Sequence, residues 1–279
     1  MNEIVVPCKR RPAEAVSTLM REASDVLKRR GNLLLLTTTF LLCLLITFTW
    51  FSVVQLIGLL FDFILRASTS PQTEAVLNGI LSILSALTFL VCVVPAWLGR
   101  LRLSGRLLLG DHPMAREVLY YYTSPRRMGR AILMGLFIAF EVMLPAVLSL
   151  GAFVGALALY NEVFVFYLPD ALAVILLIFG FLMAIAITAL LLFLSGLYLL
   201  STAIAVGNES TPVWKTFTAA FHFGKKNLST VFLFSLRSLW HLVLSLCSFG
   251  VLFVFWYAHH YNLSYLRLSM ALTKGVDPS

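Results

Sequence analysis

The stretch LLLLTTTFLLCLLITFTWFSVVQLIGLLF, residues 33–61, decides the fold class of this chain. It holds no charged side chain, and it is longer than the roughly 20 apolar residues that an α-helix needs to cross a bilayer. Inside a bilayer every backbone N–H and C=O group must be satisfied within the segment, which a helix achieves. The stretch therefore predicts a transmembrane α-helix.

Five further apolar runs follow, at residues 76–98, 131–157, 171–203, 228–247 and 251–272. Hydrophobic residues make up 60% of the chain and charged residues 12%, with a mean hydropathy of +0.92. These values lie outside the range of soluble globular domains. We therefore expect an all-α fold in which residues 1–279 form one integral membrane domain, a polytopic bundle of six transmembrane helices arranged as three hairpins. The last run is amphipathic, so partial re-entry or packing inside the bundle is an alternative for it.

The basic residues indicate the orientation of these runs. The chain has 21 Lys and Arg residues, and 18 of them lie before the first run, in segments 99–130 and 204–227, or after the last run. The exceptions are Arg66, Arg237 and Arg267. With six crossings these regions share one side of the membrane, and by the positive-inside rule that side is the cytoplasm. We expect a multi-pass membrane protein with both termini cytoplasmic. The net charge of +8 then indicates anionic lipid headgroups as partners and no nucleic acid.

Short amphipathic segments precede the first, third and fifth runs. Their apolar faces are too short to span a membrane and are flanked by basic pairs, so we expect cytoplasmic interfacial helices. The alternative is that basic residues precede outward spans in any polytopic protein. The three segments are residues 12–30, MAREVLYYY (114–122) and TPVWKTFTAAFHF (211–223).

Two charges lie deep inside apolar runs. Glu141 follows Arg130 by eleven residues, and Arg237 follows Lys226 by the same number. Each charge therefore lies about 16 Å into a hydrocarbon core about 30 Å thick, on helices of the same direction. A lone charge at that depth is costly. We expect Glu141 and Arg237 to pair, either as part of a ligand site or as a structural ion pair.

Two histidines extend this predicted polar cluster. His241 lies one turn beyond Arg237 on the same helix face, and His259 lies in the last run. His241 could relay protons, or it could be a neutral histidine bonded to a backbone carbonyl. A metal site formed by Glu141, His241 and His259 lacks supporting ligand spacing, so we expect no metal and no cofactor.

The segment between the second and third runs carries basic residues that we predict to bind lipid headgroups. Its sequence GRLRLSGRLLLGDHP, residues 99–113, has glycines and arginines but no Walker or dinucleotide-binding pattern. A basic loop beside anionic headgroups explains it more simply. The predicted headgroup-binding residues are Arg100, Arg102, Arg106, Arg126 and Arg127.

Three stretches carry a resemblance to a known family: LKRRGNLLLL (27–36), VPAWLGRLRLSGRLLLGDHPMAREVLYYY (94–122) and TPVWKTFTAAFHFGKKNLSTVFLFSLRSLWHLVLSLCSFGVLFVFWYAHHY (211–261). They resemble a family of uncharacterised six-helix bacterial integral membrane proteins. That family is similar in turn to the membrane domain of membrane-bound glycerophosphodiester phosphodiesterases. The resemblance implies the fold and a bacterial plasma membrane; the catalytic domain of the phosphodiesterases is not part of this chain. The family has a Pro-Tyr pair early in its last span, and this chain instead has Tyr257-Ala258 near that position.

The residues favour two functions. We expect a non-enzymatic protein that transports or binds a lipid or another amphiphilic or anionic small molecule near Glu141, Arg237 and His241. The alternative is a membrane scaffold subunit that docks a partner protein through its interfacial helices. A third possibility, an intramembrane enzyme, lacks a recognisable nucleophile with its base, a carboxylate pair or a phosphate-binding loop. Transport predicts a cavity that reaches Arg237, whereas scaffolding predicts a packed interior and an apolar patch on the interfacial helices.

Overall fold

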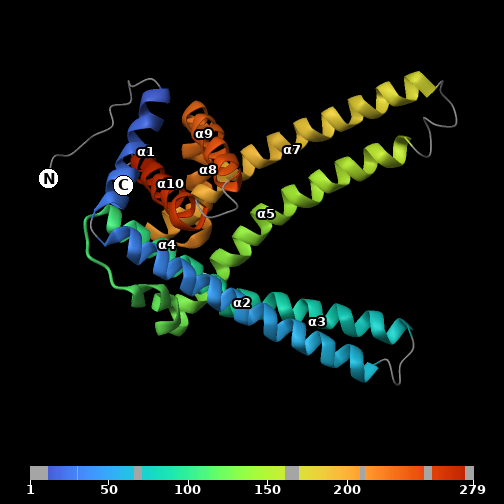
Figure 1. Cartoon of the computed structure of the whole chain (residues 1–279), viewed down its shortest axis with the longest axis horizontal. Coiled ribbons are helices and arrows are strands. Elements are labelled where there is room, and N and C mark those ends of the chain that lie inside the picture. Colours follow the sequence, from blue (N-terminus) through green and yellow to red (C-terminus); the bar gives the residue numbers. More distant parts are fainter. Residues whose placement is uncertain are drawn as a thin grey trace.

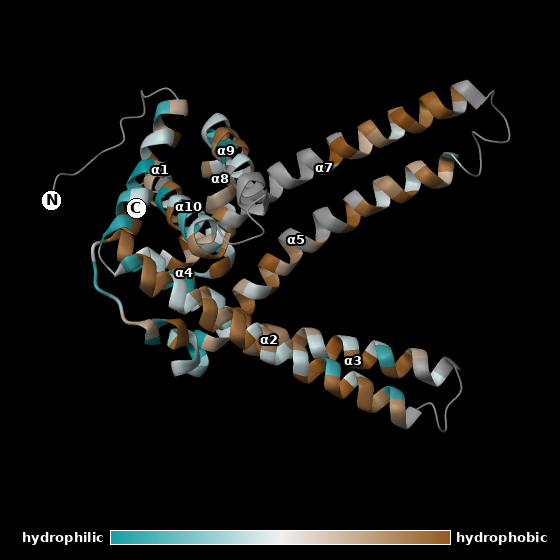
Figure 2. Ribbon diagram, in the orientation of Figure 1, coloured by the Kyte–Doolittle hydropathy of each residue, from teal (hydrophilic) through white to brown (hydrophobic). Residues whose placement is uncertain are grey.

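The computed structural model describes residues 12–29, 31–65, 71–160, 170–207, 211–247 and 253–273. All regular secondary structure in these ranges is helical, which confirms the all-α prediction. Two long helical arms diverge from a compact base of shorter helices (Figure 1). The arms hold most of the uninterrupted apolar sequence, and the base holds most of the charged residues (Figure 2).

Each arm is a pair of helices that pack along each other. The first arm consists of α2 (Asn32–Leu65) and α3 (Pro71–Cys92), and the second of α5 (Pro125–Leu159) and α7 (Asp170–Gly207). The start of α5 is specified locally, because Ser124 caps it by accepting a hydrogen bond from the backbone N–H of Arg127 at 3.3 Å. Pro125 follows in the first turn, where its missing N–H costs nothing.

Within the described residues, two helical segments are long and apolar enough to cross a membrane, Asn32–Phe63 and Ala75–Leu108. Their large apolar side chains face outward: Phe48 is 69% exposed, Phe63 82% and Ile83 64%. A soluble monomer rarely exposes contiguous apolar surface of this extent. The two segments therefore indicate association with a membrane.

The base is built around α10 (Ala258–Thr273), which packs against α1 (Pro12–Lys28), α4 (Val94–Leu108) and α7. Leu263 and Leu266 of α10 are fully buried. Around this centre lie η1 (Ala115–Thr123), a 3₁₀ helix, and α8 (Val213–Lys226), α9 (Leu228–Cys247) and η3 (Phe253–Tyr257), a π-helical turn.

The second apolar run, residues 76–98, is divided between two helices, α3 and α4. The basic segment expected to follow it as a loop is helical as far as Leu108, where α4 ends. The chain turns at Val93, and α4 then begins with Pro95 in its first turn, a position that suits proline. Leu103 and Leu107 lie four residues apart on one face of the helix, and both are buried, as is Leu98. Packing therefore stabilises α4 in the segment that was expected to be a basic loop.

Gly99 determines how η1 lies on α4. A Cβ atom at this position would lie 2.2 Å from the carbonyl oxygen of Val118, closer than any real contact. The backbone of η1 therefore crosses α4 at the residue that has no side chain. This crossing places Glu117 and Tyr120 of η1 beside the arginines of α4.

The apolar face of α1 packs against protein. We expected the helix at residues 12–30 to rest on the membrane surface, but Val16, Leu19 and Ala23 are buried within the base. The Arg267 Nε of α10 donates to the Glu22 carboxylate at 2.5 Å, and His260 Nε2 donates to the Met20 carbonyl at 3.0 Å. These contacts hold α1 on α10, which explains why its apolar face is not turned toward lipid.

Candidate functional site

A cavity of about 710 Å³ opens in the base between α4, α7, α8 and α10. One part of its lining is basic, formed by Arg102 and Arg106 of α4 and Lys215 of α8. Most of the remaining lining residues are apolar, and Asp111, Thr211, Thr216 and Ser269 are its other polar members. Its apolar lining comprises Leu109, Ala203, Ile204, Val206, Ala219, Phe223, Leu266 and Met270. A cavity of this size, lined by both charged and apolar side chains, suits an amphiphilic ligand.

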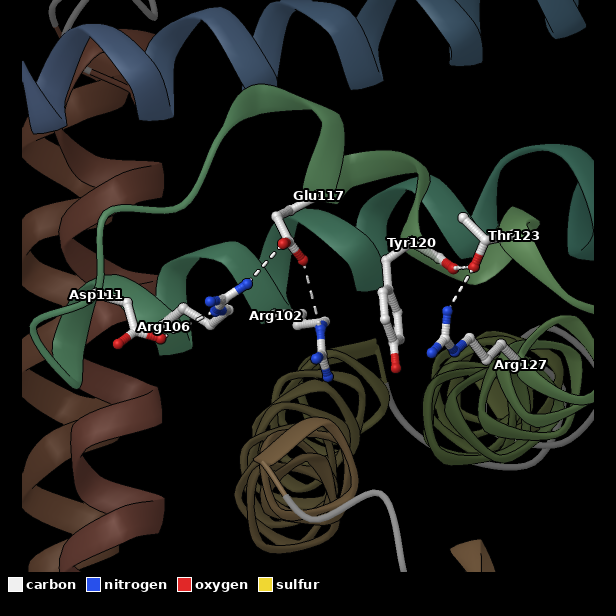
Figure 3. A network of polar contacts seen from close by, with 7 residues as sticks. All are labelled: Arg102, Arg106, Asp111, Glu117, Tyr120, Thr123 and Arg127. Atoms are coloured by element: carbon white, nitrogen blue, oxygen red, sulfur yellow. Dashed lines mark hydrogen bonds and ion pairs between the residues drawn. The ribbon is translucent and has the colours of Figure 1, made fainter.

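Two of the basic lining residues belong to a row of alternating charges (Figure 3). Arg102 and Arg106 are four residues apart and so share one face of α4. Glu117 lies between them: Arg106 Nη1 donates to its Oε1 at 2.6 Å, and Arg102 Nε lies 3.7 Å from its Oε2. Arg106 Nε also donates to Asp111 at 3.0 Å. Arg106 is thus flanked by two carboxylates.

Tyr120 continues the row beyond Arg102. Figure 3 shows its ring between the guanidinium groups of Arg102 and Arg127, whose central carbons lie 3.8 Å and 4.2 Å from the ring centre. Arg127 Nη1 also donates to Thr123 Oγ1 at 2.7 Å. Stacking engages the faces of both guanidinium groups and fixes their planes. We call Arg102, Arg106, Glu117, Tyr120 and Arg127 the basic row.

Arg130 ties the base of α5 to the rim of the cavity. Its guanidinium donates to the carbonyls of Thr211 at 2.8 Å and Ala205 at 2.9 Å, next to the cavity-lining residues Val206 and Gly207. Burial raises the pKa of the Tyr121 phenol to about 12, although the nearby positive charges of Arg102 and Arg130 lower this pKa. Tyr121 therefore stays neutral at physiological pH, and the positive charge nearby is not offset by a phenolate.

A second polar cluster is buried where α2, α4 and α10 meet. Arg100 is 1% exposed, and its Nη2 donates to Nδ1 of His259 at 2.7 Å. An arginine cannot accept a hydrogen bond, so Nδ1 is the acceptor and the imidazole proton lies on Nε2, which donates to Thr37 Oγ1 at 3.2 Å. The guanidinium also lies 4.8 Å from the ring centre of Phe40 and 5.8 Å from that of Trp97.

The structure places the predicted residues in different regions. His259 lies in the buried cluster, where it accepts the hydrogen bond from Arg100. Arg100 and Arg102 are two residues apart on α4, so they lie on different faces of the helix. Arg100 is therefore not a surface headgroup ligand, in contrast to the prediction. Arg102 and Arg106 line the cavity, whereas Arg126 and Arg127 are exposed at the start of α5.

The pairing of Glu141 with Arg237 stays a prediction. The side chains of Glu141, on α5, and His241, on α9, lie outside the part of the chain that is described. The side chain of Arg237 is exposed and has a partner, and it is not among the described residues that line the cavity. The helices that α9 packs against include α1, α7 and α8.

A double-mutant cycle tests this pairing. If the two charges pair in the membrane, Glu141→Gln and Arg237→Gln each leave the other charge uncompensated and lower the free energy of unfolding by roughly 3–5 kcal/mol. The double variant then recovers part of the loss, as measured by unfolding in detergent. Additive losses would show that the two charges have different partners.

Sequence reasoning did not identify Glu117, Tyr120 or Lys215 as site residues. The i, i+4 spacing of Arg102 and Arg106 indicates a shared face only if residues 99–108 are helical, and the glycines there indicated a loop. The approach of η1 to α4 depends on a tertiary contact at Gly99. Lys215 was recognised only as one of several basic residues beside the membrane.

The arrangement is suited to binding an anion beside an apolar group. Arginine and lysine side chains provide charge-assisted hydrogen bonds for carboxylate or phosphate oxygens. Among the described residues, no group of three or more His, Cys, Asp or Glu side chains could hold a metal ion. No protein-family model, curated protein or solved structure matches the chain.

Proposed function

We propose that this chain is a multi-pass protein of a bacterial plasma membrane that binds a lipid or another anionic amphiphile in the cavity of its base, without catalysing a reaction. The observation that carries the proposal is the composition of the cavity, which is lined both by the cations Arg102 and Lys215 and by apolar side chains such as Phe223 and Met270. Anionic lipids combine the same two properties in one molecule.

The proposed topology has six transmembrane helices in three hairpins, the third formed by α9 and α10. Both termini and the part of the base that carries the basic row lie on the cytoplasmic side in this topology. The apolar surface of the second arm supports membrane insertion of α5 and α7, since Phe140, Val147, Ile175 and Phe179 are all at least 55% exposed. The concentration of basic residues in this part of the base supports its cytoplasmic location. In this orientation the cavity lies at the level of the inner headgroups.

Single-cysteine labelling checks this topology. In a background without Cys8, Cys43, Cys92 and Cys247, we expect cysteines at positions 70 and 161, which follow the first and third apolar runs, to react with an impermeant maleimide added to intact cells. A cysteine at position 123 is expected to react only after permeabilisation. Labelling of position 123 from outside, with protection of positions 70 and 161, would show that the orientation is the reverse of the proposed one.

Lipid binding can be tested at Lys215. We expect Lys215→Gln to weaken binding of phosphatidylglycerol to the purified protein by roughly tenfold, because a charge-assisted contact is lost. Lys225→Gln is a matched control, since Lys225 is exposed on the same helix and is not among the residues that line the cavity. Native mass spectrometry with titrated lipid gives both affinities. Equal affinities for the two variants would contradict binding in the cavity.

The packing of the base supports the alternative function, a scaffold that docks a partner protein, less well than it supports lipid binding. It requires an apolar patch on the interfacial helices, and the apolar face of α1 is occupied by α10 and its neighbours. The structure leaves Trp214 and Phe221 of α8 exposed, at 57% and 41%. Aromatic residues beside lysines on a surface helix are also typical of contact with the headgroup region of the bilayer.

A further inference from the structure

We infer that the cavity takes a membrane lipid chain first, so that a hydrocarbon chain lies in its buried part and the headgroup stays at its mouth. This inference rests on the proposed function, because it specifies which part of the amphiphile the cavity encloses. The opposite orientation, with the headgroup enclosed and the chain outside, requires partners for the headgroup in the buried part of the cavity.

The burial of the lining residues divides the cavity into a mouth and a floor. The mouth is formed by the exposed lining residues, which are Leu109, Asp111, Gly207 and Lys215. The floor is formed by the buried ones, which are Ala203, Val206, Thr216, Leu266 and Ser269. Every charged lining residue is at least partly exposed, so none belongs to the floor. Because enclosing a charge without a partner is costly, the floor suits hydrocarbon better than a headgroup.

The two hydroxyl groups of the floor are already engaged. Thr216 Oγ1 donates to the Val213 carbonyl at 2.6 Å, and Ser269 Oγ donates to the Leu266 carbonyl at 2.8 Å. A hydroxyl group has one proton to donate, so neither side chain has a second one for a headgroup oxygen. The other three floor residues are apolar. The floor side chains therefore offer an anionic headgroup no hydrogen-bond donor.

The floor lies on the membrane side of the mouth in the proposed topology, in which α7 and α10 both run toward the cytoplasm. Along α7 the lining changes from the buried Ala203 to the exposed Gly207. Along α10 it changes from Leu266, which is 1% exposed, to the partly exposed Met270. The cavity therefore deepens toward the bilayer centre, which is also the direction in which the chains of inner-leaflet lipids extend from their headgroups.

Helix α8 places the mouth beside the headgroup layer. Lys215 belongs to the mouth, and its Nζ lies 5.6 Å from the ring centre of Trp214, which is 57% exposed. Tryptophan at a membrane surface is typical of headgroup depth. The sequence of α8 includes two further lysines and no Asp or Glu, so it attracts anionic lipid. A lipid of the inner leaflet can therefore keep its headgroup at this level while its chain enters the cavity.

Photoreactive lipids test this orientation. The whole chain in phosphatidylcholine nanodiscs is loaded with one of two phosphatidylglycerol probes, which carry a diazirine either at the end of one acyl chain or on the headgroup. Cross-linked residues are mapped by mass spectrometry, and competition by excess unlabelled phosphatidylglycerol identifies the specific labels. We expect the chain-end probe to label Val206 and Leu266, and the headgroup probe to label Leu109 and Asp111. Because Val206 and Leu266 are buried, lipid that surrounds the protein does not reach them.

Two substitutions that fill the cavity assign the labels to it. Gly105→Leu and Gly207→Leu add a side chain to the lining from α4 and from α7. A Cβ atom at Gly105 would lie 4.0 Å from the flexible Cε of Met270, and one at Gly207 would have no neighbouring atom within 4 Å. Each substitution is expected to remove most of the labelling of Leu266 by the chain-end probe.

Gly129→Leu is the matched control. Gly129 of α5 is exposed, its added Cβ atom would also lie in open space, and it is not among the residues that line the cavity. This variant is expected to retain the labels of the unmodified protein.

The outcomes separate the inference from the proposed function. Labelling of the floor by the headgroup probe would overturn the chain-first orientation and leave lipid binding in the cavity standing. Floor labels that persist in both filled variants would show that the chain reaches the floor residues by another route, and would also overturn the inference. The absence of specific labels from mouth and floor with both probes would overturn the inference and the proposed function together.

Discussion

Replacement of His259 by Phe is expected to lower the free energy of unfolding by about 3 kcal/mol, because it leaves the buried, charged Arg100 without its hydrogen-bond acceptor. Arg100 is 1% exposed, and none of the ion pairs formed by the described residues includes it. Nδ1 of His259, at 2.7 Å, accepts its hydrogen bond, and the remaining polar contacts are with the aromatic faces of Phe40 and Trp97. Unfolding of the purified protein in detergent, followed by circular dichroism, measures the loss.

The double variant Arg100→Met with His259→Phe is expected to recover most of this loss, because a well-packed apolar pair can replace a buried charged one at little cost. His260→Phe is a suitable control for substitution at a neighbouring histidine: His260 is only partly buried and donates to one backbone carbonyl. Its loss is expected to be about 1 kcal/mol. Equal losses for His259→Phe and His260→Phe would contradict a special role of the Arg100 contact.

Gly99→Ala is expected to destabilise the base by about 3 kcal/mol, at the upper end of ordinary overpacking. The added methyl group would lie 2.2 Å from the carbonyl oxygen of Val118 and 2.7 Å from its carbonyl carbon. Both are backbone atoms, so a change of side-chain rotamer cannot relieve the clash. Separation of η1 from α4 would also displace Glu117 and Tyr120, so anionic lipid binding is expected to fall together with stability.

Gly105→Ala is the matched control on the same helix. The nearest atom to its added methyl group is the flexible Cε of Met270, at 4.0 Å, which is an ordinary contact. Alanine favours the helix over glycine, so Gly105→Ala is expected to raise the free energy of unfolding by up to about 1 kcal/mol. Destabilisation by both substitutions would mean that the crossing of η1 over α4 is not the cause.

Hydrophobicity and charge were sufficient to predict the all-helical fold and the long apolar helices. The run at 33–61 lies within α2, and the run at 131–157 lies within α5. These predictions succeed because the composition of such a run alone determines whether it can exist in lipid. The amphipathic pattern at residues 12–30 similarly predicted helix α1, although the pattern could not show whether lipid or protein covers its apolar face.

The site was harder to predict because it depends on contacts between distant segments. Arg100 and Arg102 belong to one short basic stretch, yet one is buried against His259 and the other lines the cavity. The two side chains point in different directions because α4 is helical, and the segment was expected to be a loop. Lys215 joins the cavity from a segment more than a hundred residues away, and single-sequence patterns do not reveal such a neighbour.

The divergence of the two arms has a consequence for the bilayer around them. Two rods that spread from a common base cannot both stand along the membrane normal, and α2, with 34 residues, is about 51 Å long against a hydrocarbon core of about 30 Å. The arms meet near their roots, where Gly135 of α5 lies close to Leu90 and Val94, and they separate beyond it. In the proposed orientation, the space between them holds more lipid in the outer leaflet than in the inner one. The protein would thus occupy the two leaflets unequally, as a wedge rather than a cylinder.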